Sequence, residues 1–399
     1  MAAGKNTHLN HAEDLILLEG TDGAKRAIKL MKDMVPFLSG KPGPRMAVTT
    51  KYDGAPAVIC GTDPSDGKFF VGTKSVFAKN DPKVCKSLSD IQNWYNGALA
   101  EKLTSAFTLL RNANIKGVLQ GDLMFTNDKK TQTIDGVRYI TFRPNTITYA
   151  VEPNTKIGGN IKAAKIGIVF HTKYSGPSLP EMTSSFTIND GDFSTGGDVW
   201  AQKAEFQDIG RIASMSDSEK SNYMKAIRRA EGSISQTKGL LDKIQSGKKT
   251  LKIDTEFLKF FNNYVKAGRN IPSVEKAYVD FLYHMGAEYD KVIQKNKTLK
   301  SQAEKAGNFI AMLDFVETNK RQFKMLIATY MNLQYCKNVL VDKMKKVQSL
   351  RLFVDMGNGD YKATNDEGYV AISNDQAVKL IDRLEFSKLN FTVPKNWDK

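Results

Sequence analysis

The chain of 399 residues contains little of what disulfide frameworks, zinc sites and membrane anchors require. Its three cysteines, Cys60, Cys85 and Cys336, lie far apart and form no C-x-x-C pair, which argues against disulfides and against a cysteine-rich zinc site. Only four histidines are present, too few for extensive histidine metal clusters. No apolar stretch approaches the roughly 18–20 residues of a membrane span, and the polar start lacks a signal segment. We therefore expect a soluble, reduced, cytoplasmic protein that is a monomer.

Acidic residues are fewer than basic ones, and the difference is concentrated in one part of the chain. The sequence has 58 Lys+Arg against 43 Asp+Glu, a formal charge of +15. Residues 201–350 alone contain 27 basic and 16 acidic residues, a net of +11. A charge of this size favours a polyanionic partner. Because no membrane segment is present, we expect that partner to be DNA or RNA and not a membrane.

The residue pattern indicates two β-rich parts separated by a helical part. Up to about residue 200, short apolar runs have the length of strands, and Asn127-Asp128 and Asp135-Gly136 are typical of hairpin turns. From about Ser216 to Leu350 apolar residues recur with helical spacing, after which strand-like alternation returns. We expect an α+β fold in which a helical insertion interrupts one domain. Its predicted parts are residues 1–205, with two short helices at the start, 206–350 and 351–399.

The run from Thr50 to Gly54 places Lys51 at the end of an apolar strand, directly before an Asp-Gly turn. A lysine amine is a nucleophile only when it is uncharged, so it needs burial or nearby positive charge to lower its pKa. A strand end that points into a cleft would provide that environment. The alternative is a surface lysine that simply enters a turn.

Further charged and aromatic residues follow in an order that suits nucleotide chemistry. Taken singly, each is typical of a turn or of a charged strand edge. Together they are the groups needed to hold a nucleotide and transfer it: a second basic residue, a carboxylate, an aromatic ring, a second carboxylate and a final lysine, namely Lys74, Asp122, Phe170, Glu367 and Lys379.

This ordered series resembles the motifs of the covalent nucleotidyltransferase superfamily, which includes ATP-dependent DNA ligases, RNA ligases and messenger-RNA capping enzymes. K-Y-D-G resembles its motif I, L-Q-G-D-L-M its motif III, I-G-I-V-F-H its aromatic motif IIIa, E-G-Y-V its motif IV and A-V-K-L its motif V. The chain as a whole also resembles an uncharacterised family of large tailed phages, which would place it in the host cytoplasm. The resemblance implies a core of two packed, mostly antiparallel sheets with the nucleotide between them.

The resemblance also implies a role for each residue. Lys51 would attack the α-phosphate of ATP and hold AMP, while Thr50, Asp53 and Gly54 of the same motif would help to bind the nucleotide. Lys74 would contact the nucleotide or a 5′-phosphate, and Phe170 would stack on the base. Asp122 would bind the ribose and, with Glu367, hold Mg²⁺. Lys379 would contact the α-phosphate. Such transfers depend mainly on positioning and on neutralising negative charge.

Three positions depart from the superfamily pattern. Asp122 is one methylene shorter than the usual Glu, Pro56 occupies the place of an Arg that contacts the sugar or strand end, and Ile381 replaces the second lysine of motif V. These departures affect the prediction of the substrate more than the prediction of a lysyl-nucleotide.

About 16 residues follow Arg383, so we expect no C-terminal OB-fold, and the basic helical insertion is the candidate to replace it. Lysines grouped in it suit contacts to a phosphate backbone. The alternative is that they form the solvated side of helices. The lysines predicted to contact nucleic acid are Lys243, Lys248, Lys249, Lys295, Lys297, Lys300, Lys343, Lys345 and Lys346.

Three functions remain open at this point. The first is an ATP-dependent polynucleotide ligase that joins 5′-phosphate to 3′-hydroxyl ends of DNA or RNA. The second is a lysine nucleotidyltransferase of the capping type, with ATP or GTP as donor. The third is a non-catalytic nucleic-acid-binding protein with a degenerate ligase fold, which the weak motif V favours.

Overall fold

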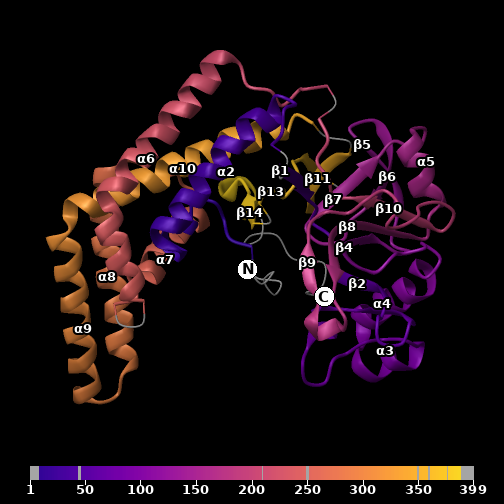
Figure 1. Cartoon of the computed structure of the whole chain (residues 1–399), viewed down its shortest axis with the longest axis horizontal. Helices are drawn as coiled ribbons and strands as arrows, with labels where there is room; N and C mark the ends of the chain where they lie inside the picture. Colours follow the sequence, from indigo (N-terminus) through magenta and orange to yellow (C-terminus); the bar gives the residue numbers. More distant parts are fainter. Residues whose placement is uncertain are drawn as a thin grey trace.

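The computed structural model describes residues 9–43, 46–208, 210–248, 251–347, 350–357, 360–374 and 376–387. Figure 1 shows the large sheets on one side of the molecule and long helices on the other. The α+β class expected from the sequence is confirmed. In the described part of the chain, no helix is both long and apolar enough to cross a membrane.

The strands of the described residues form three sheets, where the resemblance implied a core of two. A three-stranded antiparallel sheet has the order β1-β13-β14, from Met46–Lys51, Gly368–Ser373 and Gln376–Leu380. The six-stranded sheet has the order β10-β8-β4-β2-β3, with β9 beside β8; these are Val199–Lys203, Ile166–Ser175, Val118–Phe125, Ala57–Thr62, Phe69–Gly72 and Thr183–Ser185. The five-stranded sheet has the order β12-β11-β7-β6-β5, from Asp360–Ala363, Arg351–Gly357, Ile147–Val151, Val137–Phe142 and Lys130–Ile134.

Local sequence explains several of these connections. The predicted hairpin turn at Asp135-Gly136 is confirmed: it joins β5 to β6, and both residues have positive φ, 50° and 78°. Asp and Gly tolerate this conformation, which fits the twist of a two-residue hairpin. The hairpin predicted at Asn127-Asp128 is wrong, because these residues connect β4 and β5, which belong to different sheets; Asp128 accepts a hydrogen bond from the Thr126 N–H at 2.8 Å. In both places turn chemistry sets the strand boundaries.

Shorter helices cover the sheets. Helix α3 (Leu88–Trp94) and helix α4 (Gly97–Leu110) pack on one face of the six-stranded sheet, where they share a cluster with Leu119, Ile168 and Phe170. The opposite face packs against the inner face of the five-stranded sheet, together with α5 (Lys156–Ala163). Two 3-10 turns, η1 (Lys74–Phe77) and η2 (Leu179–Glu181), and a π-type turn, η3 (Arg383–Ser387), complete these regions.

Five helices form the basic helical part: α6 (Asp217–Ser246), α7 (Ile253–Lys266), α8 (Val274–Lys295), α9 (Leu299–Thr318) and α10 (Lys320–Met344). A capping box between Ser216 and Glu219 starts α6 by satisfying backbone N–H groups at its first turn. Helices α6 and α10 run together along the arm in Figure 1, and α8 and α9 form the hairpin at its far end.

The N-terminal helices α1 (Leu15–Leu18) and α2 (Gly20–Leu38) belong to the helical side of the molecule. They pack against the three-stranded sheet as well as against α6. Tyr223 of α6 donates a hydrogen bond to the Met31 carbonyl of α2 at 2.8 Å, and one large apolar cluster includes α2, the insertion helices and the three-stranded sheet. Apolar side chains of α2 are thus buried against α6, which is distant from it in sequence.

Candidate active site

Strand pairing brings Lys51 and Glu367 together although they are 316 residues apart in the chain. Lys51 ends β1, and its register partner is Gly368, the first residue of β13. Glu367 comes directly before that glycine, so its carboxylate lies beside Lys51, and the Lys51 Nζ donates a hydrogen bond to the Glu367 Oε2. Lys379 is on β14, the next strand of the same sheet, opposite Val370.

The turn after β1 places Lys51 close to the six-stranded sheet. The Ala55 N–H donates to the Leu123 carbonyl of β4 at 3.0 Å, so the turn lies directly against that strand. A Cβ added to Gly54 would lie 2.5 Å from the Cβ of Asp122 and 3.1 Å from the Leu123 carbonyl oxygen. Only glycine allows this approach, which sets Asp122 within electrostatic reach of Lys51.

Carboxylates control the charge of Lys51. Burial alone would lower the pKa of Lys51, but Glu367, Asp122 and Asp53 outweigh it and raise that pKa above its ordinary value. The expectation of a lowered pKa is therefore corrected: as the structure stands, Lys51 is an ammonium group paired with Glu367. Burial raises the pKa of Glu367, and the Lys51 charge opposes that change.

Lys379 has the opposite electrostatic environment. Burial lowers the pKa of Lys379, and the neighbouring Lys51 charge lowers it further. Both of its backbone polar groups bond to one segment, because the Lys379 N–H donates to the Asn10 carbonyl at 2.9 Å and its carbonyl accepts from the Ala12 N–H at 3.3 Å. Residues 10–12 thus lie along the edge of β14 and fix the position of Lys379.

Asp53 has a structural role beside the site. Its carboxylate accepts hydrogen bonds from the Asn145 amide at 2.6 Å and from the backbone N–H groups of Thr146 and Ile147 at 2.7 and 2.8 Å. Its own N–H donates to the Tyr149 hydroxyl at 2.7 Å. These contacts tie the turn after Lys51 to β7, so Asp53 holds that turn in place.

The stacking role predicted for Phe170 is corrected. Its side chain is fully buried in the cluster beneath α4, and its ring centroid lies 5.0 Å from that of Phe193. The next residue, His171, takes the other face of β8 and faces Asp122, with 3.8 Å between Nε2 and Oδ1. Because side chains alternate along a strand, His171 lies on the opposite face of β8 from Phe170. Gln120 pairs with Thr172 and Gly121 pairs with Phe170, so the register shift between β4 and β8 falls at His171.

Thr50 and Lys74, which were also predicted to bind the nucleotide, lie farther from the group around Lys51 and Glu367. Thr50 is on the opposite face of β1 from Lys51, and its N–H donates to the Ala204 carbonyl at 2.7 Å. Lys74 is exposed and begins η1, directly after β3. Ile59 pairs with Gly72 and Ala57 pairs with Asp122, so Lys74 lies at the same end of the six-stranded sheet as Asp122.

Sequence reasoning did not identify a second carboxyl group next to Glu367. Burial raises the pKa of Asp366 to about 7. Its charge acts on the hydroxyl groups of Tyr52, Tyr149 and Tyr369. Tyr52 also accepts a hydrogen bond from the Gln202 amide at 2.8 Å. In the sequence, only its position directly before the E-G-Y-V motif indicated that Asp366 would lie near Glu367.

The carboxylates fit a magnesium ion better than a zinc ion. Among the described residues, no group of three or more His, Cys, Asp or Glu side chains is placed to hold a metal. The Asp122 charge helps to raise the pKa of Glu367, so the two carboxyl groups are close, whereas Asp53 is already satisfied. Mg²⁺ commonly takes one or two carboxylates and completes its shell with water and substrate phosphates. Asp122 and Glu367 therefore suit that ion.

The lysines predicted to contact nucleic acid fall into three groups. For three of them the prediction is corrected, because each binds a group within the protein: Lys248 binds the Leu18 carbonyl, Lys343 binds Glu219 and Lys345 binds Glu385. Lys249 lies outside the described residues. The exposed lysines, whose role stays a prediction, are Lys243, Lys295, Lys297, Lys300 and Lys346.

Comparison with known proteins gives one match. The model of a family of unknown function (DUF6267) matches residues 6–395. The search of curated proteins and the search of solved structures found no match. The chemistry of the site therefore has to be derived from its own residues.

Proposed function

The chain belongs to this family of unknown function, and we propose that it is an ATP-dependent polynucleotide ligase working through a covalent lysyl-AMP intermediate. The observation that carries the proposal is the meeting of Lys51, Asp122, Glu367 and Lys379 around one strand end. These residues come from β1, β4, the start of β13 and β14. Two cations and two carboxylates so arranged suit the binding and transfer of a nucleotide.

The first step would form the covalent intermediate. Lys51 Nζ must lose a proton, and the nearest acceptor is the Glu367 carboxylate, to which it already donates a hydrogen bond. The Nζ lone pair then forms a bond to the α-phosphorus of ATP, and the bond from that phosphorus to the bridging oxygen breaks. Pyrophosphate leaves, and Nζ releases a second proton, giving a phosphoramidate.

Other residues would support this step by charge and position. Lys379, held by residues 10–12, would neutralise charge on the α-phosphate as the bond forms. His171 and Asp122 would face the nucleotide from the six-stranded sheet. When bound, Mg²⁺ supplies further neutralisation of the phosphates at Asp122 and Glu367.

The following steps would join two strands. An oxygen of a 5′-phosphate attacks the phosphorus of lysyl-AMP, and the P–N bond breaks as the Lys51 nitrogen takes up a proton, which releases Lys51 as an amine. A 3′-hydroxyl then attacks the activated 5′-phosphate, loses its proton and displaces AMP. The exposed lysines of the helical part would hold the strands through their phosphates.

The test follows label from ATP to protein and then to nucleic acid. The purified protein is incubated with α-labelled ATP and Mg²⁺, then chased with nicked DNA, nicked RNA or single strands. We expect label on the wild-type protein, none on Lys51→Ala, and a joined product with at least one substrate. Label without joining on any substrate would support the capping-type alternative. Absence of Lys51-dependent label would leave a non-catalytic nucleic-acid-binding protein.

A further inference from the structure

The five-stranded sheet has one face that packs on the rest of the protein and one outer face. We propose that this outer face binds a single-stranded polynucleotide and guides it towards the Lys51 site. The inference rests on the proposed function for the class of ligand. Its evidence, however, is independent of Lys51: the register of the strands, two hollows, and the placement of cations.

Strand register defines the outer face. Antiparallel partners place their side chains on the same side of a sheet, and Lys130 pairs with Thr141, which pairs with Ala150, which pairs with Arg351. These side chains therefore share the outer face. Residues on the inner face, such as Tyr149, pack instead in the cluster with α5 and the six-stranded sheet.

The outer face has an aromatic strip across its middle. Tyr139, Phe353 and Tyr361 form it, with ring centroids 6.0 Å apart for the first pair and 6.2 Å for the second. Every member of this outer cluster belongs to a strand of the sheet. Within the described residues, no helix therefore contributes to the cluster, and Tyr361 stays partly exposed.

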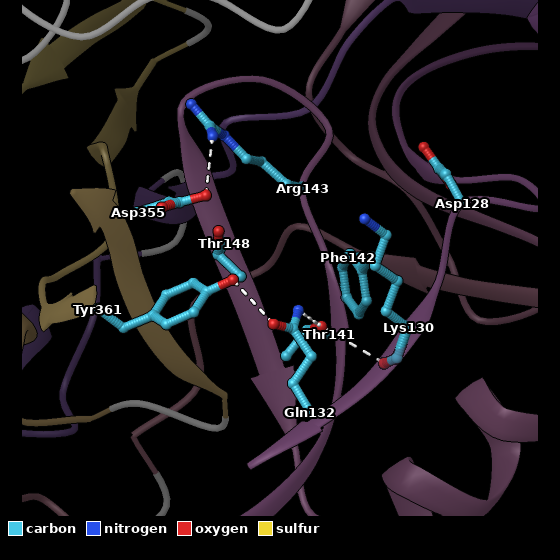
Figure 2. Close-up of a pocket in the computed structure, with 9 residues that line it drawn as sticks. All are labelled: Asp128, Lys130, Gln132, Thr141, Phe142, Arg143, Thr148, Asp355 and Tyr361. Atoms are coloured by element: carbon cyan, nitrogen blue, oxygen red, sulfur yellow. Dashed lines mark hydrogen bonds and ion pairs between the residues drawn. The ribbon is translucent and has the colours of Figure 1, made fainter. Parts of the chain in front are cut away.

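One hollow of about 300 Å³ lies on one side of the strip. Figure 2 shows Lys130 and Arg143 on its walls and the Tyr361 hydroxyl bonded to Gln132 at its lower edge. Arg143 pairs with Asp355 at 3.4 Å, whereas Lys130 is exposed and has no ion pair among the described residues. The amide and hydroxyl groups suit the edge of a base, and Lys130 suits a phosphate.

The second hollow, of about 620 Å³, lies on the other side of the strip, next to the end of α10. Tyr139 and Ile157 line it, and the exposed cations Lys346 and Arg351 stand at its margin. Neither cation has an ion pair among the described residues. Tyr139 and Phe353 are each 6% exposed and form the floor of the strip, so the partly exposed Tyr361 is the ring on which a base could stack. The cations on either side suit the phosphates of a single strand, whose bases are accessible.

The outer face is also connected to the candidate active site. The Arg143 guanidinium donates from Nε to the Asn145 carbonyl at 3.2 Å, and the Asn145 amide donates to Asp53 at 2.6 Å. Asp53 holds the turn that follows Lys51. A strand held in the hollow of Figure 2 would therefore lie near the segment that positions the nucleophile.

The experiment measures binding of a fluorescein-labelled single-stranded oligonucleotide by anisotropy at several salt concentrations, without ATP. The test variant is Lys130→Gln/Arg351→Gln. The matched control is Lys25→Gln/Lys225→Gln, which removes the same charge at exposed positions on α2 and α6. We expect the test variant to lower the slope of log affinity against log salt by about 1.4, and the affinity by roughly tenfold at low salt, because two phosphate contacts are lost.

A second measurement uses the wild-type protein, so it does not depend on how a variant folds. Lysine acetylation followed by peptide mass spectrometry should show that the oligonucleotide protects Lys130 and Lys346 but not Lys25 of α2. Equal slopes for test and control variants, no protection, or tighter binding of duplex at these residues would overturn the inference. Label transfer to Lys51 is measured separately, so failure of the ligase proposal is distinguishable from failure of this surface.

Discussion

At the scale of single residues, the main feature is the charge on Lys51. A nucleophilic amine must be neutral, yet three carboxylates raise the pKa of Lys51 above its ordinary value. The same contact also places a proton acceptor, Glu367, at the amine. Loss of the Glu367 charge from Lys51 when a nucleotide binds would leave only Asp122 and Asp53 to oppose burial and the Lys379 charge, which favour the neutral amine.

This charge state predicts a pH dependence for the first step. Because the pKa of Lys51 is raised, the neutral fraction is small near pH 7 and grows with pH. The single-turnover rate of lysyl-AMP formation at saturating ATP should therefore increase about tenfold per pH unit between about pH 7 and 9. A rate that is constant over this range would contradict the charge state described here.

At the scale of elements, the turn between β1 and β2 determines whether Lys51 and Asp122 meet. Its hydrogen bond to β4 and its contact at Gly54 leave no space for a larger residue. The edge of β14 is similarly fixed by residues 10–12, which hold Lys379. The turn after Lys51 thus holds β1 of the three-stranded sheet against β4 of the six-stranded sheet, and residues 10–12 hold the edge of β14.

Substitution of Gly54 tests the role of this turn. Gly54→Ala places a Cβ 2.5 Å from the Asp122 Cβ, so the turn must shift away from β4. We expect a loss of about 1–3 kcal/mol in the free energy of unfolding, measured in urea, and a larger loss of lysyl-AMP formation. Gly159→Ala is the control, because nothing lies within 4 Å of its added Cβ. Wild-type label transfer by Gly54→Ala would show that the close approach is unnecessary.

At the scale of the whole molecule, a buried ionic network joins the N-terminal segment, the helical part and η3, which follows β14. Glu13 pairs with Lys337 of α10 at 2.6 Å, and both side chains are 0% exposed. Asp14 pairs with Arg383 at 3.1 Å, and Tyr330 of α10 donates to the same carboxylate at 2.9 Å. The network therefore fixes the arm beside the strand that carries Lys379.

Removal of one charge from this network should be costly. Glu13→Gln leaves the Lys337 ammonium buried without its counterion, so we expect a loss of about 3–5 kcal/mol in the free energy of unfolding. The double variant Glu13→Gln/Lys337→Met removes both charges and should recover part of that loss. If the single and double variants are equally stable, the ion pair does not contribute as described.

The same pair predicts a change with acid. Burial alone would raise the pKa of Glu13, but Lys337 and its other charged neighbours lower it from 4.5 to about 2. A lowered carboxyl pKa stabilises the folded state above pH 4.5, and this contribution is lost as the pH falls towards 2. Urea unfolding should therefore show that wild type and Glu13→Gln converge in stability over that range. A constant difference between them would contradict the lowered pKa.

The sequence predicted local features better than long-range ones. Strand runs such as Gly368–Ser373 and the Asp135-Gly136 turn depend on neighbouring residues, and both agree with the structure. The third sheet and the packing of α2 on α6 depend on contacts between distant segments, which periodicity does not encode. Phe170 was predicted to stack on the base because it is aromatic. Its side chain, however, lies on the other face of β8, and His171, at the register shift with β4, lies beside Asp122.

The arm and the outer sheet face make different predictions for nucleic acid. Lys295, Lys297 and Lys300 are exposed at the α8–α9 hairpin, far along the arm in Figure 1. If the arm also holds the substrate, the triple change to Gln should lower the salt slope of single-strand binding by about 2. An unchanged slope in the anisotropy titration would leave the outer face of the five-stranded sheet as the principal binding surface.

The most direct measurement for the central claim is to locate the nucleotide on the protein. After reaction with ATP and Mg²⁺, peptide mapping by mass spectrometry should find AMP on Lys51, in a bond that acid cleaves and base does not. Glu367→Gln should greatly reduce the yield, and Lys162→Gln should not. AMP on another residue, or none at all under conditions where the protein is folded, would contradict the account.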